Sequence, residues 1–185
     1  MKKMIGKKIV HYKTVGSTND EARRLIKQGE GEGLVVIADN QTAGKGKPGS
    51  RWFSPPGNLY FSAVVKPYKN PKDLAPVTLL SALAARAMIS KVSKLPVVIK
   101  WPNDLLIRGK KVGGILTEGL ASGHLIIGLG ININNDRRTL PEELKESATS
   151  LKIETGRKIS LKKCEALLID FLDVEYRAFL QKNND

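Results

Sequence analysis

Short apolar runs separated by turn residues constrain the fold of this chain more than any other feature. Segments with the length and β-branched content of strands occur at 8–14, 34–39, 59–66, 97–100, 104–108, 111–118 and 124–131. Longer segments with apolar residues at helical spacing occur at 19–28, 73–93 and 160–180, and a short helix is expected near 141–145. Arg108-Gly109-Lys110 predicts a hairpin turn. The pattern predicts an α+β fold with helices packed on a mixed, mostly antiparallel sheet.

The composition is that of a globular protein. The chain has 185 residues, of which 41% are hydrophobic and 26% are charged, and this length suits one domain spanning residues 1–185. The formal net charge of +13 is consistent with nucleic acid, phosphate-bearing substrates or an acidic protein as partner. It is equally consistent with a lysine-rich solvated surface.

Cysteine content and hydropathy exclude several classes of protein. The single cysteine, Cys164, excludes an intrachain disulfide framework and a cysteine-based zinc site, and its helical context predicts a buried thiol. The longest uncharged apolar stretch, 74–85, is too short to span a bilayer. The basic N-terminus lacks the apolar core of a signal peptide. We therefore expect a cytoplasmic protein with no membrane association.

A long segment rich in Gly, Pro and Ser, residues 40–58, separates two predicted strands, and loops of this length are commonly functional. Its G-x-G-x-x-G match at 44–49 contains Pro48 and opens no helix, which argues against a dinucleotide site. Glycines nevertheless allow backbone N–H groups to approach an anion. Cationic and aromatic side chains accompany them: Lys45, Lys47, Arg51, Trp52 and Phe53. The segment is either an anion-binding loop or a solvated basic loop.

A second cluster, Lys100-Trp101-Pro102-Asn103-Asp104, follows an apolar strand. A lysine at the end of such a strand extends into solvent or meets an anion. Asn103 and Asp104 could orient a ligand or a hydrated Mg²⁺, although a Pro-Asn-Asp turn explains the same residues. We assign no metal-binding residue from the sequence, and neither His11 nor His124 lies in a recognisable catalytic arrangement.

Glycines also interrupt two predicted strands, at Gly113, Gly114, Gly128 and Gly130. Glycine inside a strand indicates a bulge or a close approach of another group. Asn132 and Asn134 continue the second of these strands on one face. Together with the basic loop, these elements suggest a small-molecule cleft.

These motifs resemble those of the biotin protein ligases, also called biotin–[acetyl-CoA-carboxylase] ligases, over about residues 10–180. They occur in the family's order: Gly16-Ser17-Thr18-Asn19-Asp20, Gln41-Thr42-Ala43-Gly44-Lys45-Gly46-Lys47, Lys100-Trp101-Pro102-Asn103-Asp104, Lys111-Val112-Gly113-Gly114-Ile115-Leu116, Gly130-Ile131-Asn132 and Ala148-Thr149-Ser150-Leu151. The K-W-P-N-D and G-G-I-L motifs together are highly specific.

The resemblance implies an ATP-dependent ligase. Biotin attacks the α-phosphate of ATP with the help of Mg²⁺, which gives biotinyl-5′-AMP and pyrophosphate. A lysine of a biotin carboxyl carrier domain then attacks the mixed anhydride. Such a reaction needs cations, backbone donors and a water-poor cleft, in agreement with the residues above.

The resemblance also implies site residues. Those expected to bind biotin are Ser17, Thr18, Asn19, Gln41, Gly44, Lys45, Gly114, Ile115 and Leu116. Those expected to bind ATP or the adenylate are Lys47, Trp52, Lys100, Asn103 and Asn132. Lys100 and Lys47 are the implied catalytic residues: Lys100 contacts the biotin carboxylate and the α-phosphate, and Lys47 retains the intermediate.

At the level of domains, the resemblance covers a biotin/lipoate ligase-like catalytic domain without the N-terminal winged-helix or C-terminal SH3-like domain. We therefore expect no specific DNA binding, and a separate SH3-like chain could supply the missing domain. Family members commonly form homodimers through a sheet edge. The sequence does not identify the oligomeric state or the acceptor carboxylase.

The glycine-rich loop departs from the family pattern G-R-G-R-x-G-R, because Lys45 and Lys47 replace the inner arginines and Ser50 replaces the last one. Lysine keeps the charge but lacks the planar fork that grips phosphate. We therefore expect an active enzyme with weaker retention of the adenylate.

Three alternatives remain open at this stage. A lipoate ligase or octanoyltransferase would share the fold, and biotin and lipoate binding would separate the two. A non-catalytic biotin or adenylate binder would bind biotin without releasing pyrophosphate. A nucleic-acid binder would explain the charge, but the sequence contains no motif for one.

Overall fold

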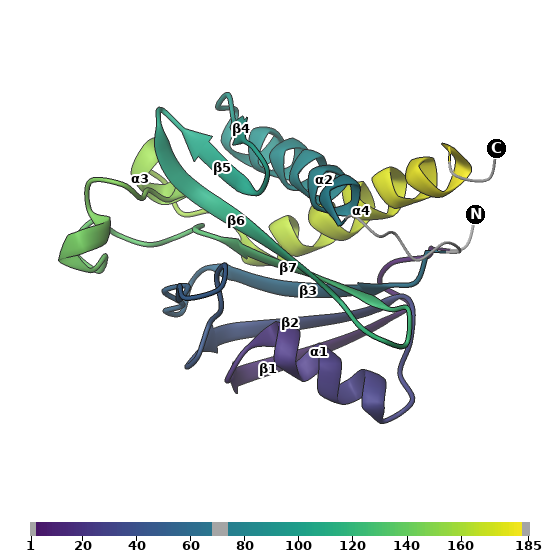
Figure 1. The fold of residues 1–185 in the computed structure, drawn as a ribbon. Helices are drawn as coiled ribbons and strands as arrows, with labels where there is room; N and C mark the ends of the chain where they lie inside the picture. The colour runs from purple at the N-terminus through teal and green to yellow at the C-terminus, as the bar shows by residue number, and fades with distance from the viewer. Residues whose placement is uncertain (1–2, 68–73, 183–185) are drawn as a thin grey trace.

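The fold is built on a seven-stranded sheet with the order β1-β2-β3-β7-β6-β5-β4 (Figure 1). The computed structural model describes residues 3–67 and 74–182. The strands are β1 (Lys8–Val15), β2 (Leu34–Gln41), β3 (Leu59–Val65), β4 (Val98–Lys100), β5 (Asp104–Ile107), β6 (Lys110–Gly119) and β7 (Leu125–Ile131). Neighbouring strands are antiparallel except for β1 and β2, which are parallel. The expected α+β fold with a mixed, mostly antiparallel sheet is confirmed.

Helices cover both faces of this sheet. They are α1 (Thr18–Lys27), α2 (Ala75–Ser93), α3 (Leu151–Thr155), α4 (Leu161–Lys182) and the single-turn 3₁₀ helix η1 (Glu142–Leu144). Figure 1 shows α2 and α4 together on one face and α1 on the opposite face, where α1 packs against β2, β3 and β7. The cleft described below lies beside the start of α1.

Helix α1 provides the crossover that a parallel strand pair requires. It begins after Ser17 and ends before Gly29, whose φ of 98° suits glycine. Its apolar side chains Ala22 and Leu25 pack against Val36 of β2. The start of α1 is thereby fixed against the sheet, which places Ser17 and Thr18 at the cleft.

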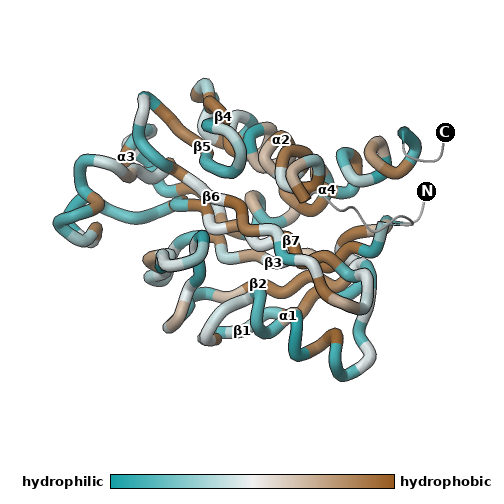
Figure 2. The backbone as a smooth tube through the Cα atoms, in the orientation of Figure 1, coloured by the Kyte–Doolittle hydropathy of each residue, from teal (hydrophilic) through white to brown (hydrophobic). Residues whose placement is uncertain are grey.

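Helix α2 is apolar over most of its surface because it packs against the sheet and α4, and its charged residues Arg86 and Lys91 are exposed. Within residues 3–67 and 74–182, it is the helix whose length and hydropathy would allow it to cross a membrane. However, more than half of this apolar segment is buried, as in the core helix of a globular domain. Figure 2 shows its apolar colour continuing into α4 and the central strands. The expected helix 73–93 begins at Ala75, and residue 73 lies outside the described residues.

Most element boundaries agree with the sequence-based expectations. The hairpin turn occurs at Arg108 and Gly109, with φ of 49° and 78°. Cys164 is buried as expected, and burial raises the pKa of its thiol to about 11. Helix α3 was not expected from the sequence, because its five residues are too few to show a helical period. Ser150 caps this helix by accepting a hydrogen bond from Ile153 N.

Candidate active site

A cleft of about 290 Å³ lies where the glycine-rich loop, the start of α1 and the strands β6 and β7 meet. Its volume is near the lower end of the about 300–1,000 Å³ found for small-molecule sites. Segments far apart in the sequence contribute its lining: 17–19, Gln41, 45–47, 50–53, 103–104, Lys111, 114–116, 128–130, Asn132, Leu140, Leu144 and 147–148. The small-molecule cleft expected from the glycines is therefore present.

Glycines form the floor of this cleft because larger residues would displace its walls. Gly114 and Gly130 lie opposite each other in β6 and β7, and the indole of Trp52 covers both. A Cβ atom on Gly130 would lie 2.5 Å from Trp52 Cε2 and Nε1. A Cβ atom on Gly128 would lie 2.3 Å from Oδ1 of Asn19. Each glycine thus permits a close approach that any side chain would prevent.

One end of the cleft is neutral and polar, and its residues are held by hydrogen bonds. Gln41 Oε1 accepts from Thr18 N at 2.8 Å, and Gln41 Nε2 donates to Ser54 Oγ at 2.9 Å. The buried hydroxyl of Ser62 lies 2.6 Å from Oδ1 of Asn19 and 2.8 Å from Oγ1 of Thr18. These groups are fixed before any ligand binds, which favours recognition of a polar, uncharged headgroup.

The other end of the cleft carries the ammonium group of Lys111, beside the carboxylate of Asp104. The loop adds Lys45, Lys47 and Arg51 to the lining of the same cleft, and Lys45 reaches back to Asp20 at the start of α1. Lys111 Nζ lies 2.7 Å from Asp104 Oδ1 and 5.3 Å from the centroid of the Trp52 ring. Its ammonium group is therefore held over the glycine floor by an ion pair and a cation–π contact. Such an excess of positive charge suits a phosphate-bearing ligand.

The glycine-rich loop closes on itself as a small hairpin, and residues 47–51 of it are exposed. Lys45 and Arg51 form an antiparallel bridge, Gly46 N donates to Ser50 O at 3.1 Å, and Trp52 N donates to Gly44 O at 3.0 Å. Arg51 Nη2 also donates to Thr42 O at 3.1 Å. The hairpin carries its cations to the cleft and places Trp52 over the glycine floor.

Most residues that the sequence assigned to the site line this cleft. They are Ser17, Thr18, Asn19, Gln41, Lys45, Lys47, Trp52, Asn103, Gly114, Ile115, Leu116 and Asn132. Gly44 is buried beside it, where a Cβ atom would lie 2.4 Å from Ser54 Oγ. Gly44 therefore allows the two arms of the loop to approach each other.

The expected placement of Lys100 in the site is not met. Lys100 ends the edge strand β4, its side chain is exposed, and it is absent from the residues that line the cleft. Lys111, on β6, lines the cleft instead. A bulge in β6 turns Lys111 toward the cleft, because Val112 and the Cβ position of Gly113 both face the core and the alternation along the strand is broken there.

The bulge brings Lys111 onto the same face as Gly114, whose Cβ position lies 3.6 Å from Lys111 Nζ. In an unbroken strand, residues three apart point to opposite faces. Adjacent glycines signalled a bulge in the sequence, but not which side chain it would redirect. The sequence thus predicted a bulge near Lys111 but not that the bulge turns Lys111 toward the cleft.

The sequence did not predict that residues 140–148, next to Lys111, belong to the site. Leu140, Leu144 and Ala148 line the cleft. Two backbone bonds hold this segment to β6: Lys111 N donates to Ser147 O at 2.8 Å, and Thr149 N donates to Lys111 O at 2.9 Å. A polar, largely irregular segment gives no periodic signal, so only the tertiary fold brings it to the cleft.

The residues present fit a metal ion brought by a ligand rather than one held by the protein. Among the described residues that line the cleft, Asp104 is the one carboxylate, and Lys111 already pairs with it. Across the described residues, no three His, Cys, Asp or Glu side chains form a group that could hold a metal. Mg²⁺ commonly binds through one or two carboxylates together with substrate phosphates. His11 and His124 lie outside the cleft lining.

Comparison with known proteins agrees with this arrangement. The model of the biotin/lipoate A/B protein ligase family matches residues 12–132. The bifunctional ligase/repressor BirA of Bacillus subtilis is 38% identical over 161 residues, which cover 84% of this chain and 50% of that protein. The biotin–[acetyl-CoA-carboxylase] ligase of Mycobacterium tuberculosis is 35% identical over 144 residues, covering 74% of this chain and 52% of that protein. The chain thus spans about half the length of these curated relatives.

Solved structures give the same result. The biotin protein ligase from Aquifex aeolicus, in complex with biotin and ATP, superposes with a TM-score of 0.85 at 34% identity. The match covers 95% of this chain and 73% of that one. The chain therefore belongs to the biotin/lipoate A/B protein ligase family and, within it, to the biotin protein ligases.

Proposed function

We propose that this protein activates biotin with ATP and transfers it to a lysine of a biotin carboxyl carrier domain. The observation that carries the proposal is one cleft that combines prearranged polar side chains at one end, Lys111 at the other and the cations of the loop, over a glycine floor. Biotin has a polar, uncharged ring system and a carboxylate, and ATP brings a polyphosphate. The solved relative bound to biotin and ATP supports this pairing of ligands.

The end of the cleft that carries Lys111 suits the first chemical step. A carboxylate oxygen of biotin forms a bond to the α-phosphorus of ATP while the bond to pyrophosphate breaks. Two anions must meet in this step, and fixed positive charge lowers the cost of their approach. We assign this role to Lys111, because Asp104 and Trp52 hold its ammonium group at the glycine floor. Mg²⁺ would enter with the phosphates of ATP, next to Asp104.

In the second step, the amine of the carrier lysine attacks the acyl carbon of biotinyl-5′-AMP. An amide forms, AMP leaves, and the amine loses a proton. The mixed anhydride must be protected from water until then. Trp52 of the loop hairpin, together with Leu140 and Leu144, supplies apolar cover in the lining of the cleft.

Transfer of labelled biotin to a purified carrier domain, together with pyrophosphate release, tests the proposal. Wild type should give both products, and Lys111→Met should lower kcat by about 10²–10³-fold, the usual cost of removing one preorganised charge-stabilising group. Lys100→Met is the matched control, with little change expected because Lys100 lies outside the cleft. Biotin binding without release of pyrophosphate would instead indicate a non-catalytic biotin-binding protein. A preference for lipoate would indicate the other activity that the family name includes.

A further inference from the structure

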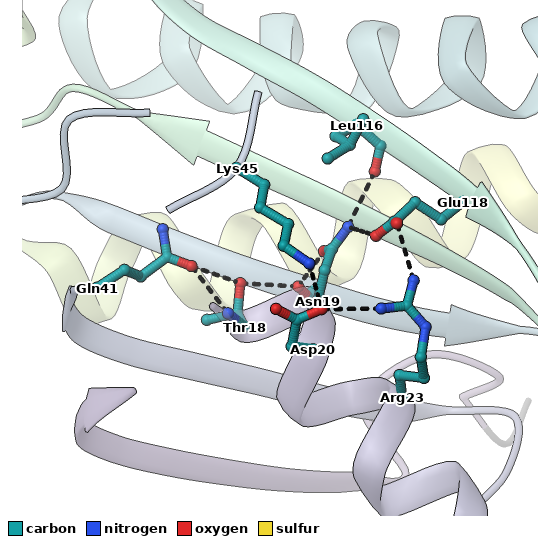
Figure 3. A network of polar contacts seen from close by, with 9 residues as sticks. Thr18, Asn19, Asp20, Arg23, Gln41, Lys45, Leu116 and Glu118 are labelled. Atoms are coloured by element: carbon teal, nitrogen blue, oxygen red, sulfur yellow. Dashed lines mark hydrogen bonds and ion pairs between the residues drawn. The ribbon is translucent and has the colours of Figure 1, made fainter. Parts of the chain in front are cut away.

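A chain of charged side chains connects the glycine-rich loop to helix α1 (Figure 3). Lys45 Nζ donates to Asp20 Oδ1 at 2.5 Å, and Arg23 Nη1 donates to the same oxygen at 2.8 Å. Asp20 thus lies between one cation from the loop and one from its own helix. Neither Asp20 nor Arg23 lines the cleft.

The chain continues from α1 into the floor of the cleft. Arg23 Nη2 donates to Glu118 Oε1 at 2.8 Å, and Glu118 Oε2 accepts from Asn19 Nδ2 at 2.6 Å. Asn19 is only 3% exposed and lines the cleft beside Gly128. The loop, α1 and β6 therefore meet in one network, shown in Figure 3, that ends at a side chain of the site.

The loop hairpin has few other attachments to the helix layer. The base of the loop is tied down, since Ala43 N donates to Gly16 O at 2.8 Å. In the part of the chain that the structure describes, the hydrogen bonds of residues 46–50 stay within the loop, as in the bond from Ser50 N to Lys47 O at 2.8 Å. The ion pair of Lys45 with Asp20 is thus the contact that fastens the hairpin to α1.

We propose that Asp20 is a positioning residue that acts through Lys45. It holds the hairpin against α1 and so slows the opening of the cleft and the escape of a bound adenylate. This inference rests on the proposed function and adds to it a residue outside the cleft.

The expected effect is modest because the ion pair is partly solvated. The side chains of Lys45 and Asp20 are 44% and 43% exposed. Pairs of this exposure change an equilibrium by roughly 1.5- to 5-fold. Salt should weaken the contact, because exposed charges are screened.

The test compares Asp20→Asn with Glu21→Gln. Both exchange a carboxylate for an amide on α1, but Glu21 pairs with Arg24 and has no bond to the loop. Limited trypsin digestion of the free protein measures loop opening by cleavage after Lys45 and Arg51, since Pro48 protects the bond after Lys47. We expect Asp20→Asn to be cut about 1.5 to 5 times faster than Glu21→Gln at low salt, with the difference lost at high salt.

The second measurement is the dissociation rate of biotinyl-5′-AMP. The dissociation rate should rise about 1.5- to 5-fold in Asp20→Asn, as for digestion, and return toward the wild-type rate in Asp20→Glu. The rate of adenylate formation should stay unchanged in both variants. Equal digestion of Asp20→Asn and Glu21→Gln, or faster digestion with unchanged dissociation, overturns the inference. If wild type forms no adenylate, the proposed function fails, and digestion alone decides whether Asp20 holds the loop.

Discussion

Replacing Gly128 with alanine should destabilise the fold by displacing Asn19. The new Cβ atom would lie 2.3 Å from Oδ1 and 2.9 Å from Cγ of Asn19, so that side chain must leave its position. It would lose its contact with the Ser62 hydroxyl at 2.6 Å and its bond to the Glu118 carboxylate at 2.6 Å. A neutral bond contributes about 0.5–1.5 kcal/mol and a bond to a charged group about 1.5–3 kcal/mol.

The loss of both bonds corresponds to about 2–4 kcal/mol, or a fall in Tm of roughly 4–16 °C for a chain of this length. Urea denaturation followed by far-UV circular dichroism measures it. Gly16→Ala is the control, because its Cβ atom meets nothing within 4 Å and its φ is not positive; its change should stay within about 1 kcal/mol. The reasoning is refuted if Gly128→Ala is as stable as Gly16→Ala.

Three further changes test other parts of the molecule. Lys47→Arg should slow dissociation of the adenylate several-fold, because arginine grips phosphate with two parallel bonds; an unchanged rate in a filter-binding assay would refute this. Burial raises the pKa of Asp173, but its bonds to Arg177 and to the amides of Ile5 and Met4 outweigh burial, so the pKa is lowered from 3.8. The difference in free energy of unfolding between wild type and Asp173→Asn should therefore be largest at pH values above the ordinary pKa of 3.8. It should shrink as the pH falls through the lowered pKa, and urea denaturation at each pH measures it. Because burial raises the pKa of Cys164 to about 11, a thiol reagent at pH 8 should label it only after unfolding, and rapid labelling of the native protein would contradict this.

The sequence indicated most of the site because its motifs have local physical causes. Adjacent glycines and a long Gly- and Pro-rich loop limit what the backbone can do, so the cleft around Gly114 and Trp52 was predictable. Lys111 was not assigned the central role, because one bulged residue reverses which face a strand side chain occupies. Lys100 was favoured because it ends an apolar run, and the sequence does not reveal that this run is an edge strand.

By itself, the sequence determined the element types, the mostly antiparallel sheet and the family's motifs, since each depends on residues close together in the chain. A cytoplasmic location, a homodimer and a separate SH3-like partner stay predictions. Only the tertiary structure decided the strand order, the bulge that turns Lys111 into the cleft, and the ion pair between Lys45 and Asp20. These features depend on contacts between segments far apart in sequence, where packing of the whole sheet, rather than any local pattern, sets which side chains meet.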